Sequence, residues 1–142
     1  MRINNLYRQV IMDHYKNPRN KGLKGFRSSR LRNPSCGDDV TVEARISNGV
    51  LEEVNHDGKG CSICCSSASV MSEVLAGKTI DEAKEIISSF YKMIKNEEFS
   101  EEGLDEAVVY QGVSQFPARM KCATISWTAL EELIGDGEVE QK

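Results

Sequence analysis

The chain lacks the features of membrane, secreted and nucleic-acid-binding proteins. None of its apolar runs approaches the roughly 18 residues that a transmembrane helix needs. Its N-terminus, MRINN, opens without the apolar stretch of a secretory signal peptide. No internal repeat, low-complexity segment or linker divides the sequence, so the 142 residues predict a single domain over residues 1–142. We therefore expect a cytoplasmic protein that does not contact a membrane.

The composition is that of a globular protein, but the charge is unevenly distributed. Hydrophobic residues make up 39% and charged residues 28% of the chain, which excludes global disorder and fibrous repeats. Residues 1–36 contain nine Lys or Arg and one acid, whereas the remainder contains nine basic and 21 acidic residues. Such a basic segment binds nucleic acid, pairs with an acidic protein or forms a solvated loop. Few aromatic residues and a pI near 5.3 argue against nucleic acid.

Hydrophobic periodicity and turn signals in the first half predict a helix followed by strands. Residues 3–15 have helical spacing and end before Pro18. Residues 23–33 are partly extended. Residues 40–46 alternate apolar and polar side chains, as in a half-buried strand, with Glu43 on the polar side. Asn48-Gly49 is the strongest short hairpin signal, and residues 50–55 form the returning strand.

The second half is predicted to be helical, which makes the fold α+β. A helix begins at Ser62 and ends near Gly77. Thr79 and Glu82 form a capping box that opens the next helix. A short acidic helix is expected over residues 100–111. Pro117 occupies the first position of a final helix that extends to about residue 134.

The five cysteines are the candidate metal-binding or reactive residues. They are Cys36, Cys61, Cys64, Cys65 and Cys122. In a cytoplasmic protein they are metal ligands or reactive thiols rather than structural disulfides, unless each is a small buried hydrophobic residue.

Three of the cysteines occupy positions that suit a metal ligand. Gly37 lets the side chains of Cys36 and Asp38, spaced i and i+2, point at one centre. Cys61 precedes a predicted helix and Cys122 falls in the first turns of another, where backbone N–H groups favour a thiolate. If the fold brings these residues together, three thiolates and one carboxylate form a tetrahedral site. Zinc is the first expectation, and an iron–sulfur cluster is the alternative.

Other residues are assigned auxiliary or packing roles. Arg119 and Lys121, with Arg32, are candidates to offset the negative charge of such a site. His14 packs or caps, and His56 ends a strand and is exposed.

Cys61 and Cys64 are spaced as a C-x-x-C redox motif, but the sequence lacks the βαβ context of thioredoxin-like folds. Cys65 lies on the same helical face as Cys61, so it is a spare ligand or thiol. We therefore regard Cys64 and Cys65 as structural or auxiliary.

Four segments carry a resemblance to a known family. They are DHYKNPRN (13–20), NPSCGD (33–38), GCSI (60–63) and FPARMKCAT (116–124). In this order they resemble the U-type iron–sulfur cluster assembly proteins (IscU/NifU N-terminal-like), and most closely the SufU branch. The resemblance implies a SufE/NifU-like fold with a small antiparallel sheet packed against helices. It also implies that Cys36, Asp38, Cys61 and Cys122 are the metal ligands.

Two details favour the SufU branch. The scaffold branch has a histidine before its third cysteine, where this chain has Lys121. The segment between Cys61 and Cys122 is also longer than in the scaffold branch, with the extra residues expected within 95–115. Cys64 and Cys65 depart from the family pattern.

The resemblance implies a zinc-dependent sulfur carrier that takes persulfide sulfur from a SufS-like cysteine desulfurase and passes it to downstream iron–sulfur assembly proteins. Cys36 is the expected acceptor, with Cys122 as the alternative, and Asp38 keeps the site labile. A second hypothesis is a scaffold on which a [2Fe–2S] cluster is built and then transferred to apo-proteins. A third, a binding module with structural zinc, fits poorly because structural sites are usually closed by Cys and His only.

Overall fold

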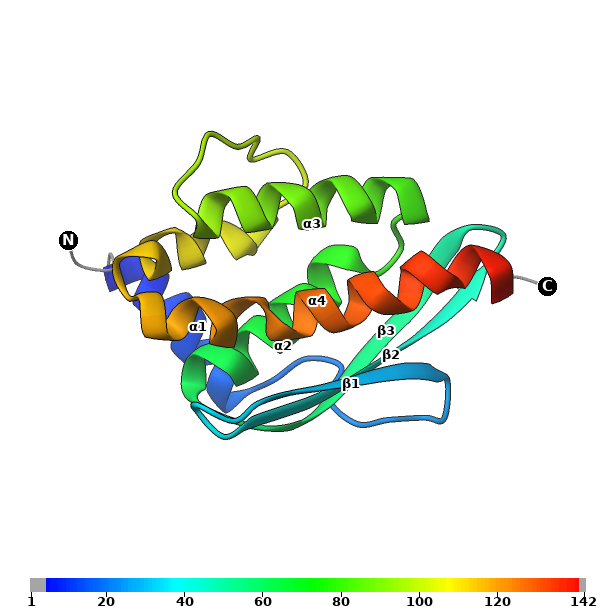
Figure 1. The fold of residues 1–142 in the computed structure, drawn as a ribbon, viewed down its shortest axis with the longest axis horizontal. Coiled ribbons are helices and arrows are strands. Elements are labelled where there is room, and N and C mark those ends of the chain that lie inside the picture. Colours follow the sequence, from blue (N-terminus) through cyan, green and yellow to red (C-terminus); the bar gives the residue numbers. More distant parts are fainter. Residues whose placement is uncertain (1–4, 141–142) are drawn as a thin grey trace.

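The structure, a computed structural model, describes residues 5–140, with side chains described up to residue 135. Its elements are α1 (Asn5–Lys16), β1 (Arg27–Asn33), β2 (Asp38–Ser47), β3 (Val50–Lys59), α2 (Ser62–Leu75), α3 (Ile80–Ile94), the 3₁₀ helix η1 (Asp105–Gln115) and α4 (Pro117–Glu140). This order confirms the expected α+β fold (Figure 1). No helix within the described part of the chain is both long and apolar enough to cross a membrane.

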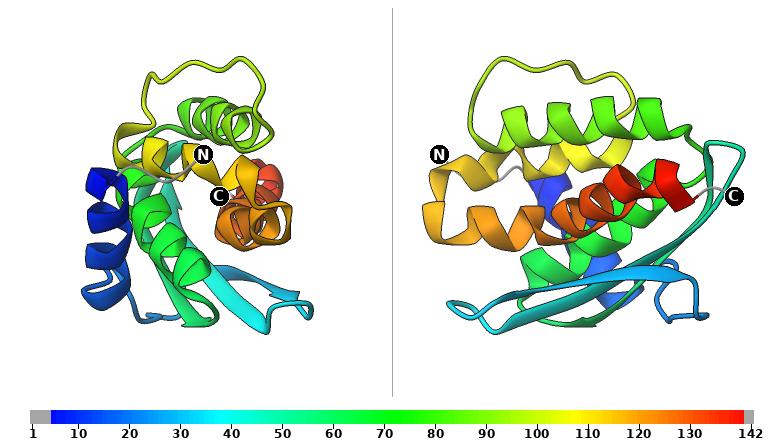
Figure 2. Two further views of the ribbon diagram at one scale, coloured as in Figure 1. Left: turned by 90° about the vertical axis from the view of Figure 1, so that its left-hand side faces the viewer. Right: turned by 45° about the vertical axis from the view of Figure 1, so that its right-hand side comes forward.

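The strands form one antiparallel sheet in the order β1-β2-β3. Asn48 and Gly49 both have positive φ, 53° and 75°, as the predicted tight hairpin requires. Helices α2 and α4 pack on one face of the sheet, and α3 lies beyond them, farther from the strands (Figures 1 and 2). Helix α1 packs beside α2. The sheet, the α2/α4 pair and α3 therefore form successive layers.

Aromatic rings fill the space between α3, η1 and α4. Phe90 stacks on Trp127 with ring centroids 3.9 Å apart, and Tyr110 meets Phe90 edge-on at 6.2 Å. The indole N–H of Trp127 donates to Ser67 Oγ at 2.9 Å, and the Tyr110 hydroxyl bonds Ser66 Oγ at 2.6 Å. Small serine side chains on α2 thus allow close packing and also satisfy the polar atoms of the buried rings.

The predicted acidic helix over residues 100–111 is instead a 3₁₀ helix that begins at Asp105 and continues to Gln115. Leu104, Ala107, Tyr110 and Val113 recur every third residue, and all four are buried. A 3₁₀ helix has three residues per turn, so this spacing places all four side chains on the core face. The final helix extends past residue 134 to Glu140.

The two histidines are both buried, so the expectation that His56 is exposed is wrong. His14 packs as expected, with its ring nitrogens bonded to Ser69 and Glu106 at 2.7 and 2.6 Å. Strand β3 extends to Lys59, past the predicted end at residue 55, and the segment after α1 pairs with it through His56. His56 Nε2–H donates to the carbonyl of Arg19 at 2.8 Å. A covering segment from elsewhere in the chain therefore buries this strand.

Glu43 is buried as well, although strand alternation placed it on the polar face. Its carboxylate accepts the backbone N–H groups of Lys24, Gly25 and Phe26 at 2.8–3.1 Å, and the amide of Asn55 at 2.8 Å. Burial opposes ionisation, but these hydrogen bonds outweigh it and hold the pKa of Glu43 below its ordinary value. The carboxylate thus anchors the loop before β1 to the sheet.

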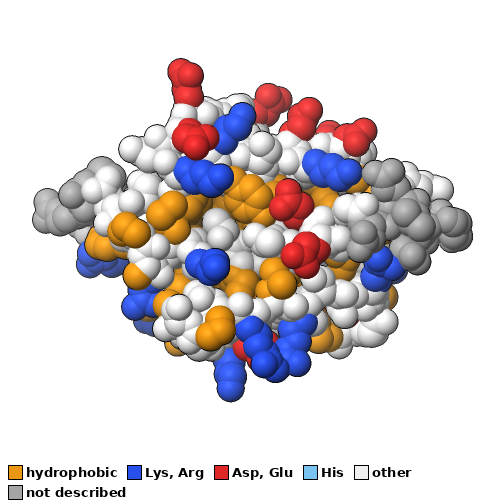
Figure 3. Space-filling view, viewed as in Figure 1, with side chains coloured by type: hydrophobic (Ala, Val, Ile, Leu, Met, Phe, Trp, Pro, Cys, Tyr) orange, Lys and Arg blue, Asp and Glu red, His pale blue; other side chains and the backbone are white. Residues whose placement is uncertain are grey.

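Charged side chains separate on the surface. Acidic side chains gather over α3 and the segment that follows it, and Lys and Arg side chains gather on the sheet side (Figure 3). The arginines of β1, including Arg30 and Arg32, contribute to the basic side. The uneven charge of the sequence therefore becomes a spatial asymmetry.

We predict that Glu43→Gln lowers the free energy of unfolding by about 2 kcal/mol, since the amide cannot accept all four hydrogen bonds as the carboxylate does. Urea denaturation at neutral pH measures the loss. Glu52→Gln is the matched control because Glu52 is exposed, and it should change stability by less than about 0.5 kcal/mol. Equal losses in both variants would contradict the anchoring role.

We predict that His56 makes the protein less stable in mild acid. Burial lowers the pKa of His56, so below the ordinary value of about 6.5 the unfolded chain binds more protons than the folded chain. The stabilisation is complete above that pH and is lost as the pH falls through the lowered folded pKa. Unfolding free energies at pH 7.5 and 5.5 should therefore differ more for the native chain than for His56→Gln. Parallel pH profiles would exclude this contribution.

Candidate metal centre

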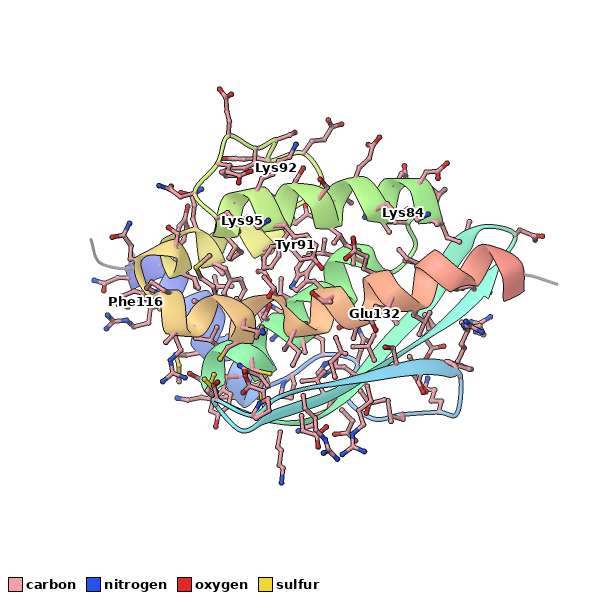
Figure 4. All side chains as sticks on the ribbon, viewed as in Figure 1. Lys84, Tyr91, Lys92, Lys95, Phe116 and Glu132 are labelled. Carbon is pink, nitrogen blue, oxygen red and sulfur yellow. The ribbon has the colours of Figure 1, made fainter. Side chains whose placement is uncertain are left out.

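Three of the predicted ligands meet where the β1–β2 turn approaches the start of α4. One ligand atom from each of Cys36, Asp38 and Cys122 lies within 4.8 Å of the other two. Cys36 is partly exposed, whereas Asp38 and Cys122 are buried. Sulfur atoms gather at this end of the molecule, near the first turns of α4 (Figure 4). A group of two thiols and a carboxylate at this separation could hold a metal ion.

The turn after β1 brings Cys36 and Asp38 together. Asn33, the last residue of β1, pairs with Asp38, the first residue of β2, and Cys36 N–H donates to the Asn33 carbonyl at 3.1 Å. Gly37 has φ +74°, a left-handed conformation that costs glycine little and other residues more. The glycine therefore allows the chain to reverse within the turn and place both ligands on one side, as the sequence indicated.

Asp38 is a buried carboxylate without a cationic partner. Its oxygens accept the Asn33 amide and the Cys61 backbone N–H, both at 3.2 Å. No Lys or Arg forms an ion pair with it among the side chains that the structure describes. A buried negative charge is costly unless it is paired or coordinates a metal. The surroundings of Asp38 therefore fit a bound cation.

Cys122 is the buried cysteine of the centre and lies in the second turn of α4. Burial raises the pKa of its thiol, and the adjacent Asp38, Cys36 and Cys61 raise it further. Burial and crowding of this kind keep the Cys122 thiol protonated unless a cation replaces the proton. Metal coordination deprotonates a thiol outright, so the same crowding that disfavours free thiolates suits a divalent ion.

Cys61 lies at the edge of this group. It caps the N-terminus of α2 and is partly exposed. Its backbone N–H donates to Asp38, and its thiol is near enough to Cys122 to raise the pKa of that thiol. The structure thus brings all four predicted ligands to one place, with Cys36, Asp38 and Cys122 tightly grouped and Cys61 beside them.

Of the three predicted neighbouring cations, Arg119 lies at the centre, whereas Arg32 pairs with Asp39 at 3.7 Å and Lys121 lines a groove elsewhere. Arg119 Nη1 approaches Cys36 Sγ at 3.9 Å, and Cys122, with Cys61 and Cys36, raises the pKa of Arg119. Lys121 lines a groove of ≈ 500 Å³ between α3 and α4, with Tyr91 and Met120. Tyr91 lies between these helices, and Phe116 lies at the start of α4 (Figure 4).

Cys64 and Cys65 have contrasting environments. Cys64 is fully buried, and its hydrogen bond with Cys65, together with burial, raises the pKa of its thiol. The same bond, with the charge of Lys21, lowers the pKa of Cys65 to about 7. The three strands β1, β2 and β3 pair antiparallel, so the C-x-x-C spacing does not lie in a thioredoxin-like βαβ unit.

Sequence reasoning missed two residues that shape the centre, Asn33 and Gly60. Asn33 is buried and holds Asp38, and its amide also approaches Cys122 Sγ at 3.8 Å. A Cβ atom on Gly60 would overlap Asp38 Oδ1 and lie 3.1 Å from Cys64 Sγ. The signal for Gly60 was its place directly before Cys61, but only the fold reveals the close approach to Asp38.

Comparison with known proteins identifies close relatives. Residues 6–123 match the family described as the NifU-like N terminal domain. The chain is 43% identical to the zinc-dependent sulfurtransferase SufU of Bacillus subtilis, over 96% of this chain and 94% of that protein. It is 36% identical to the iron–sulfur cluster assembly scaffold protein IscU of Streptococcus pyogenes, over 94% of this chain and 85% of that protein.

A solved structure shares the fold. It is the putative iron–sulfur cluster assembly scaffold protein for the SUF system from Fervidobacterium islandicum. The TM-score is 0.85 at 31% identity, and the match covers 89% of this chain and 94% of that one.

We predict that Gly60→Ala weakens metal binding at least about tenfold, because the added methyl group displaces the Asp38 carboxylate. Titration with cobalt(II), followed by its visible absorption, measures the affinity. Gly135→Ala is the matched control, since a Cβ atom there meets nothing within 4 Å. Unchanged cobalt affinity in Gly60→Ala would show that Asp38 does not participate.

Proposed function

The chain belongs to the family of NifU-like N-terminal domains, and we propose that it acts in iron–sulfur cluster assembly as a zinc-dependent sulfur carrier. The observation that carries this proposal is the buried, cation-free carboxylate of Asp38 within reach of the cysteine thiols. The relative at 43% identity, named a zinc-dependent sulfurtransferase, supports the same activity. No further cofactor beyond the metal is required.

The proposed ligands are Cys36, Asp38, Cys61 and Cys122. Three thiolates and one carboxylate match the number and type of ligands that zinc takes. When bound, zinc keeps the thiols deprotonated at neutral pH. Asn33 orients the Asp38 carboxylate, and Arg119 offsets part of the negative charge. Since a carboxylate binds zinc less strongly than a thiolate does, Asp38 keeps the centre able to open.

Cys36 is the proposed sulfur acceptor. It is partly exposed, whereas Cys122, the alternative, is buried. The Cys36 thiolate attacks the terminal sulfur of the persulfide on a cysteine desulfurase. A new S–S bond forms to Cys36, the old S–S bond breaks, and the electron pair leaves on the desulfurase cysteine. The Arg119 guanidinium, 3.9 Å from Cys36 Sγ, stabilises the resulting anionic persulfide.

The proposed partners are a SufS-like cysteine desulfurase, as donor, and downstream iron–sulfur assembly proteins, as recipients. The relatives are named as a zinc-dependent sulfurtransferase and as an iron–sulfur cluster assembly scaffold protein, and a sulfurtransferase requires a sulfur donor and a sulfur recipient. The basic side of the molecule, which includes β1, provides charge complementary to an acidic partner surface (Figure 3). Transfer takes place in the cytoplasm.

A scaffold for a [2Fe–2S] cluster is the second candidate, with the cluster as cargo at the same ligands. The 36% identity to a protein named as a scaffold favours it. The exposed Lys121, where the scaffold branch has a histidine, argues against it because Lys121 faces the α3–α4 groove. A protonated lysine is also not a metal ligand.

We predict that the chain, purified anaerobically, contains about one zinc ion and no visible chromophore. Incubated with a SufS-like desulfurase and labelled cysteine, it should acquire a persulfide on Cys36, identified by peptide mass spectrometry. Cys36→Ser should lose the label and bind zinc more weakly. Ser35→Ala, an exposed change in the same turn, is the control and should transfer sulfur normally.

Three results would each contradict a different part of this proposal. Iron with acid-labile sulfide and charge-transfer absorption would support the scaffold instead. Full labelling in Cys36→Ser, with loss in Cys122→Ser, would move the acceptor to Cys122. Undiminished transfer by Asp38→Ala would remove the argument that a weak carboxylate ligand keeps the centre open.

A further inference from the structure

A second cleft lies behind the metal centre, on the other side of Gly60. It has a volume of ≈ 440 Å³ between β3, α2 and the end of α1. Its lining includes Tyr15, Lys21, His56, Lys59, Gly60 and Cys65. None of the four proposed metal ligands lines it. The cleft is therefore separate from the centre, with the β3–α2 junction as the wall between them.

The segment carrying Lys21 is held in place by backbone pairing. Lys21 forms a β-bridge with His56, Gly22 N–H donates to the His56 carbonyl at 2.8 Å, and His56 N–H donates to the Asn20 carbonyl at 3.1 Å. This pairing places the base of the Lys21 side chain at the rim of the cleft. The pairing therefore fixes the backbone from which the exposed Lys21 side chain reaches the cleft.

His56, which lines the cleft, has one ring nitrogen, Nδ1, without a hydrogen-bond partner among the described residues. The residue is 4% exposed, and its Nε2–H donates to the Arg19 carbonyl, so the neutral ring carries a lone pair on Nδ1. No described residue bonds Nδ1, and Nδ1 is not among the fully enclosed polar atoms that lack a partner. Because His56 also lines the cleft, a ligand N–H or O–H group that reaches Nδ1 can donate to it.

Cys65 places a thiol in the same cleft. It is partly exposed, and its S–H donates to the carbonyl of Gly60 at 3.5 Å. Lys21 lines the cleft with it, so a thiol and a cation share the same cleft. Cys64, the preceding residue, is fully buried and cannot be reached. The two adjacent cysteines should therefore differ sharply in reactivity.

The charge of the cleft selects for anions. Lys21 and Lys59 line it with a single carboxylate, that of Asp57, and Asp57 Oδ1 is already bonded to the Gly58 N–H at 2.8 Å. His56 is neutral, so the lining residues carry a net positive charge. A ligand with one or two carboxylates complements this lining.

We propose that the cleft is a covalent binding site for small disulfides that carry carboxylates, with Cys65 as the reacting residue. The Cys65 thiolate attacks one sulfur of the disulfide. A mixed disulfide forms on Cys65, the original S–S bond breaks, and the electron pair leaves on the released thiolate, which takes a proton from solvent. The small disulfide is the oxidant, and an excess of the corresponding thiol reverses the reaction. This activity requires neither a desulfurase nor sulfur transfer.

The test treats the metal-loaded chain with glutathione disulfide, which carries carboxylates, and in parallel with cystamine, a cationic disulfide. Intact mass reports the adduct, and fragmentation of the peptide that contains Cys61, Cys64 and Cys65 locates it. We expect one glutathione adduct, on Cys65, formed faster than the cystamine adduct. Cys65→Ser should lose it and Cys64→Ser should keep it.

Charge variants test the recognition. Lys21→Gln should slow reaction with glutathione disulfide roughly tenfold and leave cystamine unaffected or faster. Lys92→Gln, an exposed change on α3 away from the cleft, is the matched control and should react like the native chain. Circular dichroism confirms that each variant folds.

Three outcomes would overturn the proposal. They are an adduct on Cys36, Cys61 or Cys122 in place of Cys65, equal rates with the anionic and cationic disulfides, and equal slowing by Lys21→Gln and Lys92→Gln. None of these results depends on whether the chain carries persulfide sulfur, so failure here leaves the proposed sulfur transfer untouched.

Discussion

A buried carboxylate that forms no ion pair with any described Lys or Arg governs the arrangement of this protein's centre. Asp38 lies at the start of β2 and receives hydrogen bonds from the Asn33 amide and the Cys61 backbone. Two hydrogen bonds alone do not compensate for removing a charge from water. The turn that carries Cys36, the start of α2 and the first turns of α4 converge on this group. In the proposed function a metal ion completes this group, and sulfur transfer requires that one of its ligands can be released.

Helix α2 contributes residues to the metal centre and to the hydrophobic core. Its N-terminus contributes Cys61 to the centre, and its serines accept the indole of Trp127 and bond Tyr110 in the core. Its first turn also divides the two thiol sites, since Cys64 faces the interior beside Asp38 and Cys65 faces the second cleft. The two thiol sites lie close together at Gly60, because even a Cβ atom at this position would collide with Asp38. Two chemically distinct thiol environments thus share one helix terminus.

Where sequence patterns failed, contacts from distant segments were the reason. Strand alternation placed Glu43 on a polar face, yet the loop before β1 folds over that face and supplies three backbone N–H groups. His56 was expected at an exposed strand end, yet residues 20–22 pair with it. The acidic helix expected over residues 100–111 is a different case, because the three-residue spacing of Leu104, Ala107, Tyr110 and Val113 is a local pattern typical of a 3₁₀ helix.

The sequence by itself determined the α+β order, the Asn48-Gly49 hairpin, the capping box of α3 and the four segments that carry the family resemblance. These features depend on local backbone preferences and on spacing within a few residues, which a linear pattern records. Only the tertiary structure decided that Cys36, Asp38 and Cys122 meet, that Arg119 joins them while Lys121 points elsewhere, and that Cys65 opens into a separate cleft. Those outcomes depend on how helices pack over a sheet, and such packing joins residues that are more than 80 positions apart in the chain.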